Sequence, residues 1–330
     1  MIKAAVIGVG SMGMNHARIY DALEVVALVG VCDADAEQAN RVASRYRTRH
    51  YGDHAALLDE ERPDLVSIVV PTGLHHEVAL DVIDRGLHLL VEKPIADTVT
   101  NAQEIIERAQ ARGVQLMVGH VERFNPAVSE LKRRLEDGHL GKMFQLHARR
   151  LGPFPHRVRD VGVVIDLATH DLDVMCHLTG AGVIRVYAET EQEIHTLHED
   201  SLSGLLRFDN GVVGVLDVNW LTPTKVRELY VTGEKGMFMV NYLTQDLYLY
   251  ENEYVDSDWD RLGMLKGVGE GNMIKLRIGK KEPLYAELEA FVRSVEEGGE
   301  PPVTGEDGIR ALALAQAMVD SGRQHRTVEF

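Results

Sequence analysis

The segment Gly8-Val9-Gly10-Ser11-Met12-Gly13 matches the pattern G-x-G-x-x-G and directly follows an apolar run. Glycines at these positions permit a tight turn from a strand into a helix, and they let backbone N–H groups approach a pyrophosphate at the helix N-terminus. Asp33 lies 20 residues after Gly13, the spacing of the carboxylate that accepts hydrogen bonds from an adenosine ribose. A glycine turn in an unrelated α/β protein is the alternative. The combination favours a dinucleotide site with these contacts: Gly8, Gly10, Ser11, Met12, Gly13 and Asp33.

The residue at position 33 also bears on the choice between NAD and NADP. The carboxylate of Asp33 would repel a 2′-phosphate, and Ala34 beside it carries no positive charge to hold one. NAD is therefore the expected cofactor. An arginine from elsewhere, such as Arg41 or Arg45, could reverse this preference.

The tripeptide Glu92-Lys93-Pro94 follows another apolar run and could bring a lysine to the reaction. In an open α/β sheet the ligand crevice lies at the carboxyl ends of the strands, and the proline disfavours helical backbone angles at Lys93. A lysine at this place could donate to a substrate oxygen as that oxygen becomes an alkoxide. A solvated surface lysine is the alternative, and the tripeptide alone does not separate the two.

Asp166 and His170 are four residues apart, on one face of a predicted helix. A carboxylate beside an imidazole raises its basicity and orients it, as a general base requires, and Asp173 adds a second carboxylate to that face. A zinc site is one rival interpretation, although no third ligand is obvious beyond His75 and His76. Acidic helix caps with a hydrogen-bonded histidine are the other.

A basic island stands out in an acidic chain: His147, Arg149, Arg150, His156, Arg157 and Arg159. The segment Gly152-Pro153-Phe154-Pro155 in its middle predicts a loop. Arginines on a rigid loop suit bidentate recognition of phosphate or carboxylate. Surface or interface salt bridges explain the same residues equally well.

Short apolar runs alternate with helical patterns in the first part of the chain, which predicts a doubly wound parallel sheet, an α/β fold of the Rossmann type. The expected strands are Lys3–Val9, Val25–Cys32, Leu65–Val70, Leu87–Val91 and Val114–Val118. The expected helices are Ser11–Leu23, Ala36–Tyr46, His76–Arg85 and a helix that begins near Thr98 and stops at Gly113. We expect this NAD-binding domain to span residues 1–122.

The remainder predicts an α+β domain over residues 123–330 with a large, mostly antiparallel open sheet. Its expected strands are Lys142–Leu151, Val183–Glu189, Ser201–Phe208, Val212–Trp220, Lys225–Thr232 and Met237–Tyr242, with a hairpin at Asp209-Asn210-Gly211. Its expected helices are Pro126–Asp137, Gly162–Leu178, Tyr285–Glu296 and Asp307–Ser321. Too few helices remain to cover both faces of such a sheet, so we expect a homo-oligomer formed through it.

Composition and charge exclude several classes of function. The net charge of −16, from 35 basic and 51 acidic side chains, disfavours nucleic-acid binding, because an acidic surface repels phosphates. No apolar run reaches the length of a membrane span, and the N-terminus enters a strand pattern too early for a signal peptide. Cys32 and Cys176 lie in apolar runs typical of buried free thiols. We therefore expect a cytoplasmic protein.

With these residues in place, the chain resembles the glucose–fructose oxidoreductase / inositol dehydrogenase / rhizopine-catabolism (Gfo/Idh/MocA) family over essentially its whole length. The motifs are specific only jointly: Gly8 to Gly13, Pro71-x-x-x-His75, Glu92-Lys93-Pro94, Gly119-His120-x-x-Arg123-Phe124-x-Pro126 and Asp166-x-x-x-His170. The resemblance implies a Rossmann domain followed by an α/β domain with a large open sheet. It also implies dimers or tetramers, and hydride transfer between a sugar-like hydroxyl and NAD(P).

The resemblance further implies roles for individual residues. Lys93, Asp166 and His170 become the catalytic set, with His170 as the base and Lys93 polarising the reacting oxygen or relaying its proton. The implied cofactor contacts then also include Pro71, Thr72, His75, Glu92 and Lys93. The implied substrate contacts are Arg123, Asn125, Arg150, Arg157 and His170. No metal is expected.

Within the family, residues 119–126, 150–155 and 160–166 are most similar to enzymes that oxidise the 3-hydroxyl of UDP-N-acetylglucosamine, whose diphosphate the basic island would face. His156 departs from that pattern, which has proline or another small residue there. An inositol or simple-sugar dehydrogenase of the same family is the nearest alternative. Others are an NAD-dependent glycosidase, in which NAD cycles without net redox, and a non-catalytic NAD or sugar sensor, which would not require Lys93 and His170 together.

Overall fold

A computed structural model describes residues 1–155, 161–195, 197–254 and 268–330. Their packing forms two compact units, Met1–Phe124 with Glu282–Ala313, and Asn125–Lys281 with Leu314–Phe330. The expected boundary after residue 122 lies two residues from the observed one. The sequence analysis groups residues 282–313 with the second domain, whereas Leu284, Leu288 and Phe291 are buried in the core of the first unit. That residues 1–122 bind cofactor and 123–330 bind substrate stays a prediction.

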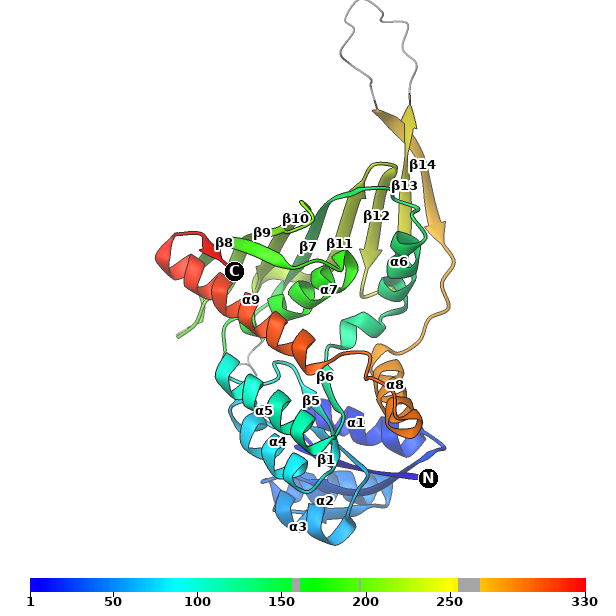
Figure 1. Cartoon of the computed structure of the whole chain (residues 1–330), viewed down its shortest axis with the longest axis vertical. Helices are drawn as coiled ribbons and strands as arrows, with labels where there is room; N and C mark the ends of the chain where they lie inside the picture. Colours follow the sequence, from blue (N-terminus) through cyan, green and yellow to red (C-terminus); the bar gives the residue numbers. More distant parts are fainter. Residues whose placement is uncertain (156–160, 196, 255–267) are drawn as a thin grey trace, which may run out of the picture. The chain divides into compact units, whose positions relative to one another are not determined.

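The first unit contains a six-stranded parallel sheet in the order β3-β2-β1-β4-β5-β6 (Figure 1). This is the strand order of a Rossmann fold, as the alternating pattern predicts. Strands β4 and β6 are buried at every position, because helices cover both faces of the sheet. The strands are β1 Ile2–Ile7, β2 Val26–Cys32, β3 Arg49–Tyr51, β4 Leu65–Ile68, β5 His88–Glu92 and β6 Leu116–Gly119.

The helices of this unit begin and end close to the predicted residues. Asp35 and Thr98 accept hydrogen bonds from the first turns of their helices, and Gly113 ends α5 in the left-handed conformation. The sequence analysis missed β3 and α3, since a three-residue strand carries too little pattern to detect. The helices are α1 Ser11–Ala22, α2 Ala36–Tyr46, α3 His54–Glu61, α4 His75–Asp84, α5 Val99–Arg112 and α8 Pro283–Glu297.

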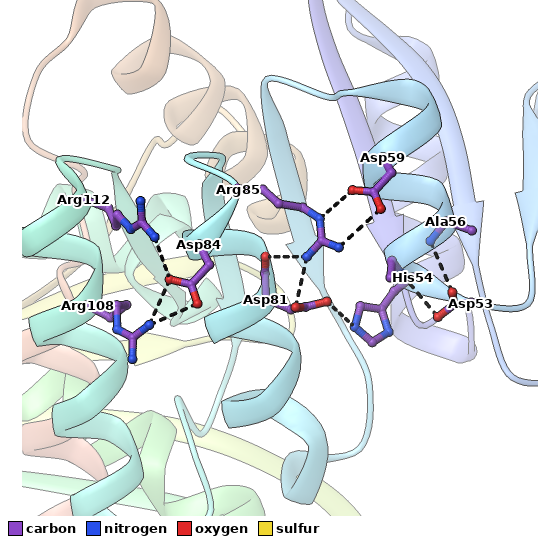
Figure 2. A network of polar contacts seen from close by, with 10 residues as sticks. Asp53, His54, Ala56, Asp59, Asp81, Asp84, Arg85, Arg108 and Arg112 are labelled. Carbon is purple, nitrogen blue, oxygen red and sulfur yellow. Dashed lines mark hydrogen bonds and ion pairs between the residues drawn. The ribbon is translucent and has the colours of Figure 1, made fainter.

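Charged side chains join α3, α4 and α5 on the outside of this unit (Figure 2). Arg85 Nε donates to Asp59 Oδ1 of α3 at 2.8 Å, and Arg85 Nη1 lies 3.0 Å from Asp81 Oδ1 of α4. Arg108 of α5 contacts Asp84 at 2.9 Å. These groups are partly exposed, so each pair contributes at most about 1 kcal/mol to stability.

The second unit contains a nine-stranded sheet in the order β14-β13-β12-β11-β7-β10-β9-β8-β15. Only β7 and β10 are parallel, so the prediction of a mostly antiparallel sheet is confirmed. The sequence analysis did not predict β13, β14 or β15. The strands are β7 Met143–Pro153, β8 Val183–Glu191, β9 Ser201–Phe208, β10 Val213–Asn219, β11 Leu221–Gly233, β12 Gly236–Asn241, β13 Asp246–Tyr254, β14 Val268–Leu276 and β15 Val328–Glu329.

Helices cover one face of the nine-stranded sheet. They are α6 Pro126–Glu136, α7 Thr169–Thr179 and the part of α9 (Gly305–Gln324) that belongs to this unit (Figure 1). Burial alternates along β10 and β12, with every second residue buried beneath these helices. Within the described residues, no helix covers the other face, where Tyr230, Val215 and His147 are only half-buried.

The basic island is only partly a loop. Strand β7 continues through Gly152 and Pro153, so the prediction of a loop from residue 152 was wrong. The strand continues because β11 pairs with it as far as Pro153, opposite Leu221. His156, Arg157 and Arg159 lie outside the described residues.

Arg150, on β7, forms a buried ion pair with Asp171 of α7. Arg150 Nε donates to Asp171 Oδ2 at 2.7 Å and Arg150 Nη2 donates to Oδ1 at 3.0 Å. Both residues are almost fully buried, and the guanidinium also lies 5.2 Å from the ring centroid of Tyr242. This bidentate pair ties the covering helix to the sheet.

Replacement of Asp171 by alanine leaves the buried guanidinium without its carboxylate. We expect Asp171→Ala to lower the free energy of unfolding by about 3–5 kcal/mol, measured by urea denaturation followed by circular dichroism. Asp209→Ala is the control, because the exposed carboxylate of Asp209 accepts one hydrogen bond from the described residues, donated by Gly182 at the surface, and its loss should cost about 1 kcal/mol or less. Equal losses in the two variants would contradict the structural role of the pair.

Candidate active site

The residues predicted to bind the cofactor lie at the carboxyl ends of four neighbouring strands of the Rossmann sheet. Gly8 follows β1, Asp33 follows β2, Pro71 lies just beyond β4 and Lys93 follows β5. The chain order reverses between β1 and β4. Ligands of open α/β sheets bind in the crevice at this point.

Gly8 and Gly13 are required by close packing of the backbone. Gly8 has a φ of +86°, and a Cβ atom there would lie 2.6 Å from the carbonyl carbon of Val69. A Cβ atom on Gly13 would lie 1.8 Å from the carbonyl oxygen of Gly8. These contacts bring the first turn of α1 against the ends of β1 and β4.

Gly10 has a different environment, which fits a bound dinucleotide. Among the described residues, no atom beyond its chain neighbours lies within 4 Å of a Cβ atom placed on Gly10, so packing among these residues does not demand a glycine there. No described side chain caps the N-terminus of α1, which begins at Ser11. An uncapped helix N-terminus beside open space is the arrangement that receives a pyrophosphate.

A cavity of about 490 Å³ extends from this loop along the strand ends, a volume typical of small-ligand sites. It is lined by Ile7, Gly8, Gly10, Cys32, Asp33, Ala34, Gly52, Asp53, His54, Val69, Val70, Pro71, Leu74, Glu77 and Val78. Asp33 Oδ2 accepts a hydrogen bond from Val9 N at 2.8 Å and Oδ1 accepts one from Asp35 N at 3.0 Å. Each carboxylate oxygen keeps a lone pair for a ribose hydroxyl. The cavity therefore fits the adenosine half of NAD(P).

Sequence reasoning missed part of this cavity. Gly52, Asp53 and His54 reach it from the β3–α3 connection, and Leu74 and Glu77 reach it from the start of α4. The missed signal is Asp53, an N-cap side chain that accepts hydrogen bonds from Ala55 N and Ala56 N directly before an apolar helix.

His75 holds together the segments that follow β4 and β5. Its Nδ1 lies 2.8 Å from the carbonyl oxygen of Pro94, and its Nε2 lies 2.9 Å from that of Val70. Burial lowers the pKa of His75, although the two carbonyls and the charge of Glu92 oppose this shift. His75 thus positions the turn that carries Lys93.

Glu92 is buried and interacts with the chain itself. Its Oε1 lies 3.0 Å from Nε2 of His16, a fully buried residue of α1, and its Oε2 accepts a hydrogen bond from Lys93 N at 3.2 Å. Burial alone would raise the pKa of Glu92, but the hydrogen bond and charge of His16, together with Lys93, bring it below the ordinary value. Glu92 therefore links the helix behind the glycine loop to the backbone of Lys93. Its role as a direct cofactor contact stays a prediction.

Asp166 and His170 lie in the second unit, where a π-helical turn over Val164–Ala168 leads into α7. Both side chains are half-buried. A π-helical turn inside a helix often marks a functional site, because it displaces side chains from regular α-helical positions. The predicted single helix over Gly162–Leu178 is thus observed as a π-helical turn followed by an α-helix.

Glu199 supports the start of this helix and was not singled out from the sequence. Its carbonyl oxygen accepts a hydrogen bond from Val163 N at 2.9 Å, and its carboxylate Oε1 accepts one from Val164 N at 3.2 Å. A Cβ atom on Gly162 would lie 2.0 Å from that Oε1, so the cap requires glycine at position 162.

The loop that carries Glu199 is organised by Asp200. The buried carboxylate of Asp200 accepts hydrogen bonds from the backbone N–H groups of Glu193, Ile194 and His195. Nothing in the local sequence predicts this contact, because it depends on the path of the loop.

Besides Arg150, two more of the predicted substrate contacts have structural partners. Arg123 Nη1 donates to Asp307 Oδ2 at 3.0 Å within the first unit. Burial alone would raise the pKa of Asp307, but the hydrogen bond and charge of Arg123 bring it below the ordinary value. Asn125 caps α6 by accepting from Ala127 N, and its amide donates to the carbonyl oxygen of Tyr242 at 3.1 Å. Substrate contact by Arg123, Asn125 or Arg150 stays a prediction.

Three further features concern the described residues. Cys32 and Cys176 are buried and form no disulfide, as predicted. Among the described helices, none is long and apolar enough to cross a membrane. Within the part of the chain that the structure describes, no three His, Cys, Asp or Glu side chains form a group that could hold a metal ion.

Gly10→Ala and Gly13→Ala form a matched pair, because each adds one methyl group to the same loop. We expect Gly13→Ala to lower the Tm, since its Cβ overlaps the carbonyl oxygen of Gly8. We expect Gly10→Ala to leave the Tm unchanged and to weaken NADH binding about tenfold or more, measured by thermal denaturation and by calorimetric titration. Unchanged NADH affinity in Gly10→Ala would contradict the assignment of this loop.

Comparison with known proteins agrees with this arrangement. A model of the oxidoreductase family with an NAD-binding Rossmann fold matches residues 2–120, and the GFO/IDH/MocA C-terminal domain matches residues 128–239. The UDP-N-acetylglucosamine 3-dehydrogenase of Acidithiobacillus ferrooxidans is 32% identical over 314 residues, which cover 95% of each protein. The myo-inositol 2-dehydrogenase of Thermotoga maritima is 24% identical and covers 100% of this chain and 98% of that protein.

A solved structure of the Acidithiobacillus ferrooxidans enzyme superposes with a TM-score of 0.86 at 31% identity, covering 97% of each chain. An oxidoreductase from Agrobacterium radiobacter, solved in complex with NAD⁺, L-tartaric acid and magnesium, has a TM-score of 0.87 at 21% identity and shares the fold. The chain belongs to the Gfo/Idh/MocA oxidoreductase family and is an NAD(P)-dependent oxidoreductase that acts on CH–OH groups of sugars.

Proposed function

We propose that this protein oxidises the 3-hydroxyl of a nucleotide sugar, most specifically UDP-N-acetylglucosamine, with NAD as hydride acceptor. The observation that carries the proposal is the 32% identity, over 95% of both chains, to an enzyme named for that reaction. Arg150 is engaged by Asp171, and Arg149 lies beside Asp217 and Glu228. The proposal therefore assigns the diphosphate mainly to Arg157 and Arg159, which lie outside the described residues.

The proposed chemistry assigns one task to each catalytic group. Bound NAD supplies the hydride acceptor. His170 accepts the proton of the sugar hydroxyl, Asp166 stabilises the imidazolium that forms, and Lys93 donates to the reacting oxygen. The contacts of Glu92 with Lys93 N and His16 fix the backbone at Lys93, and the cap from Glu199 fixes the backbone just before Asp166, which supports these roles.

The cavity supports NAD over NADP. Asp33, Asp53 and Glu77 line it, and no lysine or arginine is among its described lining residues. Arg41 donates to the side chain of Gln38, and the Arg45 guanidinium lies 5.5 Å from the ring centroid of Tyr46. Neither of the two arginines considered as alternatives therefore lines the cavity where a 2′-phosphate would bind.

An inositol or simple-sugar dehydrogenase is the second candidate. The myo-inositol 2-dehydrogenase of Thermotoga maritima matches the chain along its entire length. Its lower identity of 24% places it behind the nucleotide-sugar proposal. The two functions share the cofactor and the catalytic groups. They differ in the role of the basic island, which would bind the diphosphate of a nucleotide sugar and would be structural in an inositol or simple-sugar dehydrogenase.

Absorbance at 340 nm distinguishes these functions. We expect purified protein with NAD to form NADH with UDP-N-acetylglucosamine, and not with UDP-glucose, myo-inositol or glucose. His170→Asn and Lys93→Met should lower kcat by roughly 10²–10⁴, while calorimetric Kd values for NADH stay within a few-fold of the parent value.

Each other outcome has a defined meaning. Signal with myo-inositol or glucose alone would replace the nucleotide-sugar proposal with the second candidate. Near-normal turnover in either variant would reject the catalytic role of that residue. Glycoside cleavage without a change at 340 nm would indicate the NAD-dependent glycosidase.

We further propose that the uncovered face of the nine-stranded sheet joins two copies of this chain. Strand register aligns a row across seven strands of this face: Tyr248, Met239, Tyr230, His147, Val215, Leu205 and Tyr187. Leu205 is 49% exposed. A parallel row of charges flanks it, in which Arg149 lies 3.7 Å from both Asp217 and Glu228. A largely apolar row bordered by both charge signs suits a self-complementary interface.

Leu205→Asp should separate the copies, because it buries a carboxylate in the proposed interface. We expect the parent protein to show at least twice the chain mass by light scattering and the variant to shift toward one chain mass. Leu243→Asp is the control, since Leu243 is exposed in the turn after β12. A parent protein with the mass of a single chain would refute the interface.

A further inference from the structure

The polar side chains that line the adenosine cavity are all able to accept hydrogen bonds. They are the carboxylates of Asp33, Asp53 and Glu77 and the imidazole of His54. Asp53 uses its oxygens to cap α3, through bonds of 3.3 Å from Ala55 N and Ala56 N. Asp33 is predicted to bind the adenosine ribose. The side chains of Glu77 and His54 are therefore available to contact the adenine base.

The tautomer of His54 follows from its neighbour (Figure 2). His54 Nε2 lies 3.1 Å from Asp81 Oδ2, and an ionised carboxylate can only accept a hydrogen bond. When the ring carries one proton, Nε2 therefore holds it, and Nδ1 presents a lone pair. Nδ1 has no hydrogen-bond partner among the described residues, and the His54 side chain is 24% exposed.

Arg85 holds Asp81 in this arrangement. Its Nη1 lies 3.0 Å from Asp81 Oδ1, and its Nε donates to Asp59 of α3. The carboxylate that orients His54 is thus attached to both helices that border this part of the cavity (Figure 2). The acceptor at Nδ1 is positioned before any ligand binds.

Cys32 reports the electrostatic character of the same cavity. Burial, together with the charges of Asp53 and Asp33, raises the pKa of its thiol to about 12. The thiol stays neutral, and the cavity keeps an excess of acceptors over donors.

We infer that His54, assisted by Glu77, selects the adenine base by accepting hydrogen bonds from its exocyclic amino group. This inference rests on the proposed use of NAD and identifies residues that read its base. Hypoxanthine carries a carbonyl oxygen where adenine carries the amino group. That oxygen would place one lone pair against another at His54 Nδ1 and a partial negative charge near Glu77.

Calorimetric titration with NADH and with reduced nicotinamide hypoxanthine dinucleotide tests this inference without any sugar substrate. We expect the parent protein to bind NADH about tenfold more tightly than the hypoxanthine analogue. His54→Phe keeps an aromatic ring and removes the acceptor, so the ratio of the two Kd values should fall several-fold toward one, mainly through weaker NADH binding. Glu77→Gln supplies an amide donor and should also lower the ratio.

His76→Phe is a matched control. His76 Nε2 lies 2.9 Å from Glu104 Oε2, and its side chain is 25% exposed, but it does not line the cavity. This variant should keep the parent ratio. Equal affinity of the parent for both dinucleotides, or an unchanged ratio in His54→Phe, would overturn the inference while leaving the use of NAD intact. Binding of NADPH but not NADH would instead overturn the proposed cofactor and this inference with it.

Discussion

The contact between Gly13 and the carbonyl of Gly8 governs the geometry of the first unit. With no side chain at either position, α1 begins directly against the end of β1, and the loop packs on the backbone of Val69 at the end of β4. The helix N-terminus is therefore fixed at the point where the strand order reverses. A single methyl group at Gly13 would separate helix and strand, whereas the space at Gly10 is left for a ligand.

Carboxylates position the other functional segments. Glu92 connects α1 to the backbone of Lys93, Asp171 ties α7 to β7 through Arg150, and Glu199 caps the turn before Asp166. Each is buried or partly buried, and each has a partner far away in sequence. A buried carboxylate without such partners would be costly, so these contacts are strongly coupled to correct folding.

The same principle applies to the arginines that were predicted to contact the substrate. Arginines in a basic island could equally bind an anionic substrate or form internal ion pairs, and composition does not separate these outcomes. Arg150 occupies a position of β7 that faces the covering helix α7. Because the side chain is buried there, its charge requires a partner within the protein. Arg123 likewise pairs with Asp307, which follows it by 184 positions. Which carboxylate lies beside each arginine is decided only by the folded structure.

Local sequence was sufficient for the Rossmann sheet, the glycine loop, Asp33 and the position of Lys93. Strands buried on both faces appear as continuous apolar runs, and glycines with special backbone angles stand directly beside them. These signals arise between residues that are neighbours in the chain, so they can be detected from the sequence alone. The family motifs that include Asp166 and His170 belong to the same class of local signal.

Contacts between distant segments depended on tertiary structure. The short strand β3 is stable only because β2 pairs with it, and it brings Asp53 and His54 to the cavity. The buried partner of Glu92 is a histidine 76 positions earlier, and residues 282–313 complete the core of the first unit. The sequence by itself determined most of the strands and helices and the family motifs, because hydrophobic period and backbone geometry are local properties. Only the folded chain decided which charges neutralise one another and which acceptors line the cofactor cavity, because electrostatic and packing energies depend on distance in space.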